Sequence, residues 1–99
     1  MIVPGESESF VEKETGMTSM ARELTVEIAL HARTDPALVD LDAHLVVDLG
    51  LSSLDVLSVL AFAETTFDVV FADGEIGGLT TVRSIERAVR AQRSQKEHV

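Results

Sequence analysis

The sequence predicts an all-α fold: a small antiparallel four-helix bundle with three longer helices, one short helix and a long first loop. Three separate segments place apolar residues three and four positions apart, which is the spacing of one face of an α-helix. A single short run, residues 69–71, has the composition of a strand, and no second run exists for it to pair with. The chain has 99 residues, enough for one domain with a single core.

Composition and charge exclude several classes of function. The formal net charge is −9, from 17 acidic and 8 basic residues, which argues against nucleic-acid binding and favours contacts with basic patches on partner proteins. The absence of cysteine excludes a disulfide framework, a thiolate metal site and a nucleophilic thiol, and the cytoplasm is the default location. No apolar run reaches the length of a membrane span, and the acidic N-terminus lacks the basic start of a signal peptide.

The chain divides into a folded part and two polar ends. Residues 1–19 are predicted to be a flexible N-terminal extension, because they are rich in glutamate and serine and poor in large apolar side chains. A docking extension is the alternative, and Met17 or Met20 offers a later translation start. Residues 20–93 form the expected domain, and residues 94–99 a flexible C-terminal tail.

The first helix is expected from Met20 to Ala32, with Ser19 as its cap. Its apolar stripe consists of Leu24, Ile28 and Ala29, with Val26 or Leu30 at its margins. His31, in the last turn, could be a metal ligand or a base. It has no His or Cys partner nearby in the sequence, so a solvated histidine at the helix end is favoured.

A long connection, residues 34–50, follows, and Asp35-Pro36 is expected to open a short helical turn in it. Its apolar content is too high for a free loop, so several of its side chains should fold onto the bundle. These side chains are Leu38, Val39, Leu41, Leu45, Val46 and Leu49. A hydrolase triad of Ser53, His44 and a nearby Asp is conceivable, but no oxyanion-hole loop or sheet scaffold supports it.

The segment Asp48–Asp55, with the sequence DLGLSSLD, is the most informative stretch of the chain. Ser52 is the expected N-cap of the second helix, and Asp55, three residues later, completes a capping box. Ser53 then lies on the first helical turn, with a free hydroxyl near the positive end of the helix dipole. Unpaired backbone N–H groups there favour a negatively charged group such as a phosphodiester. The alternative is that both serines only cap the helix.

The second helix is expected to end near Phe67 and Asp68, with an apolar stripe that includes Leu57, Leu60, Ala61 and Phe67. Residues 69–71 are interpreted as an apolar connector into the core. A short third helix is expected to open at Asp73-Gly74-Glu75 and to end at Gly77-Gly78. The twelve-residue calcium-loop pattern is absent there, so these acids are interpreted as solvated.

The last helix is expected from Thr81 to about Arg90 or beyond, capped by Thr80. Val82, Ile85, Ala88 and Val89 form its apolar face, and Arg83, Arg87, Arg90 and Arg93 form a basic face. That basic face could bind an acidic partner or a membrane surface. A balance to the acidic second helix and to the helix's own dipole is favoured.

The run DLGLSSLD, continued by VLSVLAFAETTFD, resembles the prosthetic-group segment of acyl carrier proteins. The likeness extends without a gap to Leu79–Val82, which is similar to the family's entry into its last helix, and more loosely back to about Met20. In that family a serine followed by leucine at the start of the second helix carries 4′-phosphopantetheine. The matching residue is Ser53, followed by Leu54. One position departs from the pattern, because Ser52 stands where the family usually has an acidic residue.

The resemblance implies a carrier and not an enzyme. A phosphopantetheinyl transferase would attach the arm, taken from coenzyme A, to Ser53, and the arm would present acyl thioesters to a ketosynthase, an acyltransferase or other acyl-processing enzymes. The unusual residue at position 52 favours a polyketide or related specialised pathway over a housekeeping fatty-acid carrier or a peptidyl carrier. An unmodified helical adaptor is the alternative from a different class.

The resemblance also indicates where partners dock. Any partner that reaches an arm on Ser53 must approach the second helix, which is less acidic here than in typical members of the family. The expected docking residues are Ser52, Leu54, Asp55, Val56, Val59 and Glu64. No metal, nucleic acid or membrane is expected at this site, and the carrier is expected to be a monomer.

Overall fold

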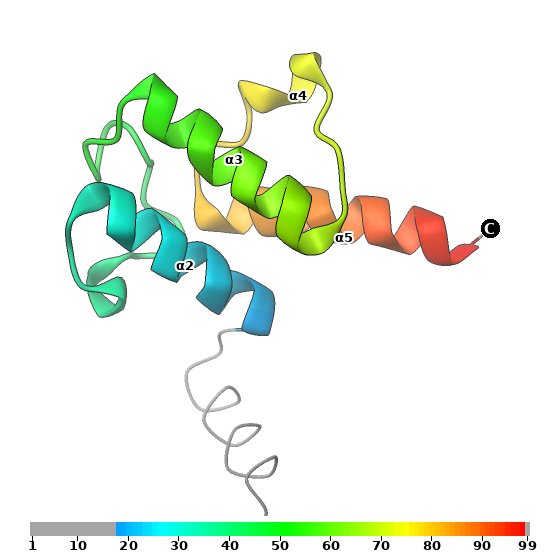
Figure 1. Ribbon diagram of the computed structural model, residues 1–99, viewed down its shortest axis with the longest axis horizontal. Coiled ribbons are helices and arrows are strands. Elements are labelled where there is room, and N and C mark those ends of the chain that lie inside the picture. Colours follow the sequence, from blue (N-terminus) through cyan, green and yellow to red (C-terminus); the bar gives the residue numbers. More distant parts are fainter. Residues whose placement is uncertain (1–17, 99) are drawn as a thin grey trace, which may run out of the picture.

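The computed structural model describes residues 18–98, and the predicted extension lies outside them except for its last two residues (Figure 1). Helix α2 spans Ser19–Ala32, the 3₁₀ turn η1 spans Pro36–Leu38, and α3 spans Ser53–Phe67. The short helix α4 spans Asp73–Ile76, and α5 spans Val82–His98. These described residues contain four α-helices and no strand, so the predicted all-α class is confirmed. None of the four helices is long and apolar enough to cross a membrane.

The three longer helices pack against one another in pairs, and α3 runs antiparallel to α2 (Figure 1). Their shared core is aliphatic with two phenylalanines. The central stripe of α2 and the predicted apolar face of α5 contribute to it, with Ala88 at its margin, whereas Val26 and Leu30 of α2 are exposed. The most deeply buried side chains are Leu24, Ile28, Leu45, Val59, Val82, Ile85 and Val89. The first loop supplies Leu45 and Val39 to the core, while Leu38 and Val46 remain exposed.

At three helix starts, two residues with hydroxyl side chains stand next to each other. The predicted N-cap is correct for α3 and wrong for α2 and α5. The N-cap of α3 is Ser52, as expected. The cap of α2 is Thr18 and not Ser19, because the Thr18 Oγ1 accepts a hydrogen bond from the Ala21 N–H. At α5 the Thr81 Oγ1 accepts from the Ser84 N–H, so Thr81, and not Thr80, has the capping role.

Two helices end on residues with left-handed backbone that are not glycine. Arg33 closes α2 and Asp68 closes α3, each with a φ of 58°. Helix α4 ends at Gly77, as expected, but this glycine does not have left-handed backbone, because its φ is −62°. The glycine that does need its conformational freedom is Gly50, with a φ of 76°, in the turn that leads into α3.

The connector after α3 enters the core as predicted, with Val69 and Phe71 buried. Its backbone is satisfied by side chains instead of a neighbouring strand. Glu64 accepts a hydrogen bond from the Phe71 N–H at 2.8 Å, and Gln92 of α5 bonds to both the N–H and the carbonyl of Val70. An apolar run can therefore cross the bundle without a strand partner.

Candidate functional site

The candidate site is the first turn of α3, where the chain leaves the long loop. A tight turn precedes it, in which the Gly50 N–H donates to the Val46 carbonyl and the Leu51 N–H donates to the Leu45 carbonyl. Leu51 is buried and anchors this turn to the core. The helix consequently starts at a fixed point on the surface, immediately after Leu51.

The Ser52 hydroxyl is fully used by the capping box. It accepts a hydrogen bond from the Asp55 N–H at 3.1 Å and donates to the Asp55 Oδ2 at 2.9 Å. The same carboxylate oxygen accepts from the Ser52 N–H at 3.0 Å. These bonds satisfy two backbone donors of the helix start, which is the structural task of a capping box.

The Ser53 hydroxyl differs from its neighbour. Ser53 is exposed, and within residues 18–98 its side chain makes no hydrogen bond. It lies at the first helical position, where backbone N–H groups point outward and the dipole is positive. An accessible hydroxyl beside such donors is compatible with a covalently attached phosphate.

Asp55 carries the negative charge closest in sequence to this hydroxyl. Hydrogen bonds from Ser52 and a further contact from His31 hold the pKa of the Asp55 carboxyl below its ordinary value. The second carboxylate oxygen, Oδ1, lies 3.1 Å from the Nδ1 of His31 at the end of α2. His31 is thus not the solvated helix-end residue that was favoured, because it bridges two helices.

The alternative chemistries gain no support from the geometry. The Nδ1 of His44 accepts hydrogen bonds from the N–H groups of Val46 and Val47, and Asp48 accepts from the His44 N–H. The His44 and Asp48 side chains therefore both bond to backbone N–H groups of the 44–47 turn. Neither side chain bonds to Ser53 within the described chain. No group of three potential metal ligands occurs in the part of the chain that the structure describes.

The expected docking surface on α3 needs correction. Val59 is 0% exposed and belongs to the core, so it cannot contact a partner. Leu57, which was placed in the apolar stripe, is 49% exposed instead, and Ala61 is exposed as well. Val56 is half-buried against the core, and one carboxylate oxygen of Glu64 is already bonded to the connector. The buried face of α3 is formed by Val59, Leu60, Ala63 and Phe67.

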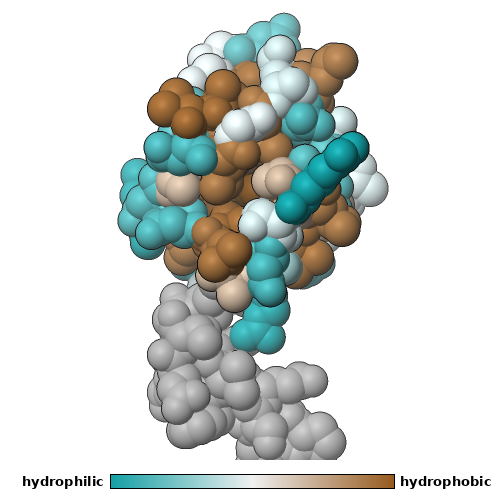
Figure 2. All heavy atoms as spheres, turned by 90° about the vertical axis from the view of Figure 1, so that its left-hand side faces the viewer, coloured by the Kyte–Doolittle hydropathy of each residue, from teal (hydrophilic) through white to brown (hydrophobic). Residues whose placement is uncertain are grey.

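Exposed apolar side chains instead surround the start of α3. Leu54, directly after Ser53, is 75% exposed, and Val47 in the preceding turn is 77% exposed. Together with Val46 and Leu57 they form what we call the apolar rim, comprising Val46, Val47, Leu54 and Leu57. Figure 2, which faces this end of the molecule, shows apolar groups spread between hydrophilic ones. Exposed apolar area beside a reactive group is typical of a protein interaction site.

The predicted basic face of α5 is present on the surface. Glu86 and Arg90 form the expected ion pair at 2.9 Å, and Arg83 pairs with Asp42 of the long loop at 2.6 Å. A hollow of about 470 Å³ lies where α5 meets the start of α2 and the end of α3. It is lined in part by Arg90, Arg93 and Phe67, at the opposite end of α3 from Ser53.

Comparison with known proteins shows the family to which the chain belongs. The family described as "Phosphopantetheine attachment site" matches residues 22–89, which include the whole of α3. An acyl carrier protein of Aster yellows witches'-broom phytoplasma (strain AYWB) is 36% identical over 58 residues, which cover 59% of this chain and 76% of that relative. The chain therefore belongs to the family of phosphopantetheine-bearing acyl carrier proteins. Its prosthetic group is a covalently attached 4′-phosphopantetheine, and its function is that of an acyl carrier.

Sequence reasoning found the serine pair and the capping box but missed the contacts that surround them. The capping box is local, since three residues separate Ser52 from Asp55. The His31 contact joins residues 24 positions apart, and no local pattern marks it. The exposure of Leu54 and Val47 is also a tertiary property, although Leu54 was already among the expected docking residues.

Proposed function

We propose that Ser53 is the residue that carries the 4′-phosphopantetheine arm and that the chain is a cytoplasmic carrier dedicated to a polyketide or related specialised pathway. The observation that carries the first part is the contrast between two adjacent hydroxyls. The Ser52 hydroxyl is used by the capping box, whereas the Ser53 hydroxyl is exposed and makes no bond within the described residues.

The chain itself presents and orients the Ser53 side chain, and the transferase catalyses the attachment of the arm. The capping box fixes the backbone of the first turn of α3, so the Cα–Cβ bond of Ser53 has a defined direction. Outward N–H groups of that turn favour the phosphate once it is attached. No hydrogen-bonded base contacts Ser53 in the described chain, so we assign its deprotonation to the transferase. When bound, the arm supplies a thiol that holds acyl groups as thioesters.

The specialised-pathway assignment is supported by the surface around Ser53. Ser52 takes the place of an acidic residue, and the apolar rim supplies exposed aliphatic groups from the segments before and after the serine in the chain. Ketosynthase or acyltransferase partners would then be recognised by apolar contact, with Asp55 as a charged neighbour. A housekeeping fatty-acid carrier and a peptidyl carrier are the alternatives within the same family.

Intact mass spectrometry tests the carrier function directly. The apo-protein is incubated with coenzyme A and a broad-specificity phosphopantetheinyl transferase, together with a known carrier as a positive control. A mass gain equal to one phosphopantetheine arm is the expected result. An unchanged mass beside a loaded control would favour the unmodified helical adaptor. Subsequent loading with malonyl, fatty-acyl and aminoacyl thioesters then separates the three carrier types.

A further inference from the structure

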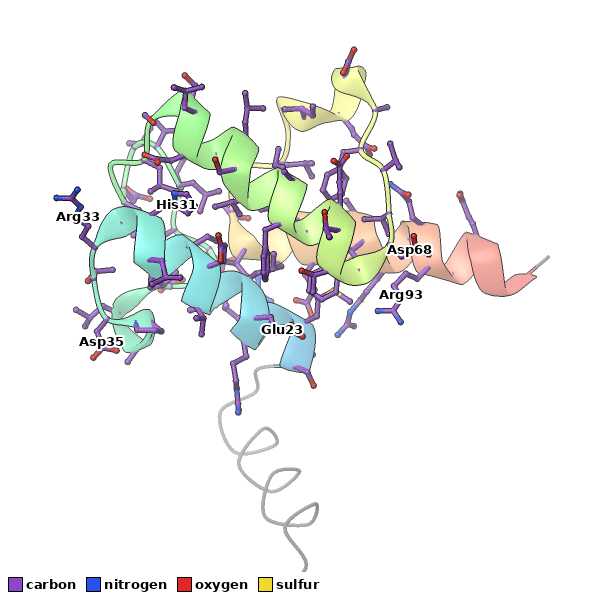
Figure 3. The ribbon with its side chains drawn as sticks, viewed as in Figure 1. Glu23, His31, Arg33, Asp35, Asp68 and Arg93 are labelled. Carbon is purple, nitrogen blue, oxygen red and sulfur yellow. The ribbon has the colours of Figure 1, made fainter. Side chains whose placement is uncertain are left out.

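His31 lies between two carboxylates, at the point where α2 ends and α3 begins (Figure 3). Its Nδ1 is 3.1 Å from the Oδ1 of Asp55 on α3, and its Nε2 is 3.4 Å from the Oε2 of Glu27 on α2. The His31 side chain is 23% exposed, so the ring is partly shielded from water. No other basic group forms an ion pair with Glu27 or Asp55 in the described part of the chain.

The protonation state of the ring decides how many of these contacts it makes. A neutral imidazole carries one N–H and can donate to one carboxylate, whereas an imidazolium carries two and can donate to both. The Oδ1 of Asp55 faces His31, and its Oδ2 holds the N–H and hydroxyl of Ser52. One carboxylate therefore links the end of α2 to the cap of α3.

We propose that His31 is a positioning residue for arm attachment: through Asp55 it holds the first turn of α3, and with it Ser53, more firmly when the ring is protonated. The first turn is the exposed end of its helix, and it contributes few side chains to the core. Such helix ends open at little cost in free energy. A tie from α2 reduces that opening and keeps the backbone that presents Ser53 in one conformation.

The other histidine beside the site behaves in the opposite way and gives a matched control. The Nδ1 of His44 accepts two backbone N–H groups, which requires an unprotonated nitrogen. Protonation of His44 would therefore loosen the 44–47 turn, while protonation of His31 would tighten the start of α3. No hydrogen bond or ion pair joins the two rings in the described part of the chain, so their effects can be separated by substitution.

The first test follows the wild-type protein by NMR during a pH titration across the range in which histidine titrates. The Asp55 carboxylate carbon and the amide groups of Ser52 and Ser53 should shift with the same midpoint as the His31 ring. The shifts should vanish in His31→Gln and persist in His44→Gln. A Ser53 amide that stays constant while His31 titrates, or that still shifts in His31→Gln, would overturn the proposal. The titration of the wild-type protein tests the proposal even if a variant fails to fold.

The second test measures transferase loading and rests on the proposed function. Loading rates of His31→Ala and His31→Gln are compared with wild type at each pH, which cancels the pH dependence of the transferase itself. We expect His31→Ala to load about two- to fivefold more slowly at the acidic end, the size of effect typical of one partly exposed ion pair. His31→Gln, which keeps one donor but does not titrate, should match wild type at high pH only.

The outcomes separate the inference from the function on which it rests. If no protein loads, wild type included, the carrier assignment fails. If all variants load equally at every pH, the carrier assignment stands and the positioning role of His31 is wrong. If His31→Ala loads faster than wild type at acidic pH, the imidazolium only masks the Asp55 charge from the transferase, which would also contradict positioning.

Discussion

The first turn of α3 and the three turns that follow it are stabilised by different forces. At Ser52–Asp55 the stabilising contacts are hydrogen bonds around a capping box, and the serine and leucine side chains are exposed. From Val59 onward one face of the helix lies in the core, with Leu60, Ala63 and Phe67 buried beside it. A modifiable hydroxyl and a stable core can therefore share one helix, because the contacts that hold the helix lie away from the turn that presents Ser53.

The largest effect that sharpens this comparison is expected from two leucines three residues apart. Leu60 is buried and Leu57 is exposed on the apolar rim. Leu60→Ala should cost about 2–5 kcal/mol of unfolding free energy, through lost burial and a residual cavity. Leu57→Ala should change it by less than about 0.5 kcal/mol, as is usual for exposed positions. Chemical denaturation of both variants measures the difference, and equal losses would mean that the buried face of α3 is assigned wrongly.

Partner binding should depend on the first turn and its rim. We expect Leu54→Asp to weaken the affinity for a cognate acyl-processing enzyme by about tenfold or more, because exposed apolar groups beside Ser53 would contact that partner. Asp55→Asn should have a smaller effect, and raising salt to physiological levels should weaken binding only modestly. Val59→Asp is unsuitable for this purpose, since Val59 is buried and the variant should unfold.

Affinities of the folded variants, measured against salt concentration, decide whether partners dock mainly through apolar contacts or mainly through charge. A steep salt dependence combined with normal binding by Leu54→Asp would mean that dispersed acidic charge steers partners. In that case the neutral residue at Ser52 would have little bearing on recognition.

The cap itself should matter moderately for stability, and Ser52→Ala should still accept the arm, at a reduced rate because the first turn is held less firmly. Ser52→Ala should lower the unfolding free energy by about 0.5–2 kcal/mol, because the Asp55 N–H loses its acceptor at the helix start. Thr81→Ala at the start of α5 is a matched control, since the Thr81 hydroxyl also caps its own first turn, through bonds to Ser84. Thermal and chemical denaturation check both. A Ser52→Ala variant as stable as wild type would show that the capping box contributes nothing.

A smaller effect is expected from acid titration of Asp55. Hydrogen bonds from Ser52 lower the pKa of this carboxyl in the folded protein below its ordinary value of 3.8. The sign follows from linkage: the stabilisation is fully present above about pH 3.8 and is lost as pH falls through the lower folded value. Asp55→Asn should therefore flatten this part of the stability curve. Asp42→Asn is the comparison variant. The hydrogen bond from Arg83 also holds the pKa of the Asp42 carboxyl below its ordinary value, so this variant removes a shift of the same direction at a carboxyl outside the capping box.

A helix cap of this chain was predictable from sequence only where a second residue at the right spacing marked it. Ser52 could be chosen over Ser53 as the cap because Asp55 lies three residues later and completes the box. The choices of Ser19 over Thr18 and of Thr80 over Thr81 were wrong, because no acidic residue at the corresponding position distinguishes the hydroxyls in those pairs.

The buried face of α3 was misjudged for a different physical reason. The helix is apolar around most of its circumference, so periodicity alone cannot decide which side meets the core. Contacts with α2 and α5 make that decision, and they bury Val59 instead of Leu57. The same limit applies to His31 and Asp55, whose contact depends on how two helices meet.

The central claim is that Ser53, and not Ser52, carries the arm, and one measurement tests it most directly. Ser53→Ala and Ser52→Ala are each incubated with coenzyme A and the transferase, and their intact masses are compared with that of loaded wild type. The account predicts that Ser52→Ala gains one arm and that Ser53→Ala, while folded, gains none. Loading of Ser53→Ala at the wild-type rate, together with an unmodified Ser52→Ala, would contradict it.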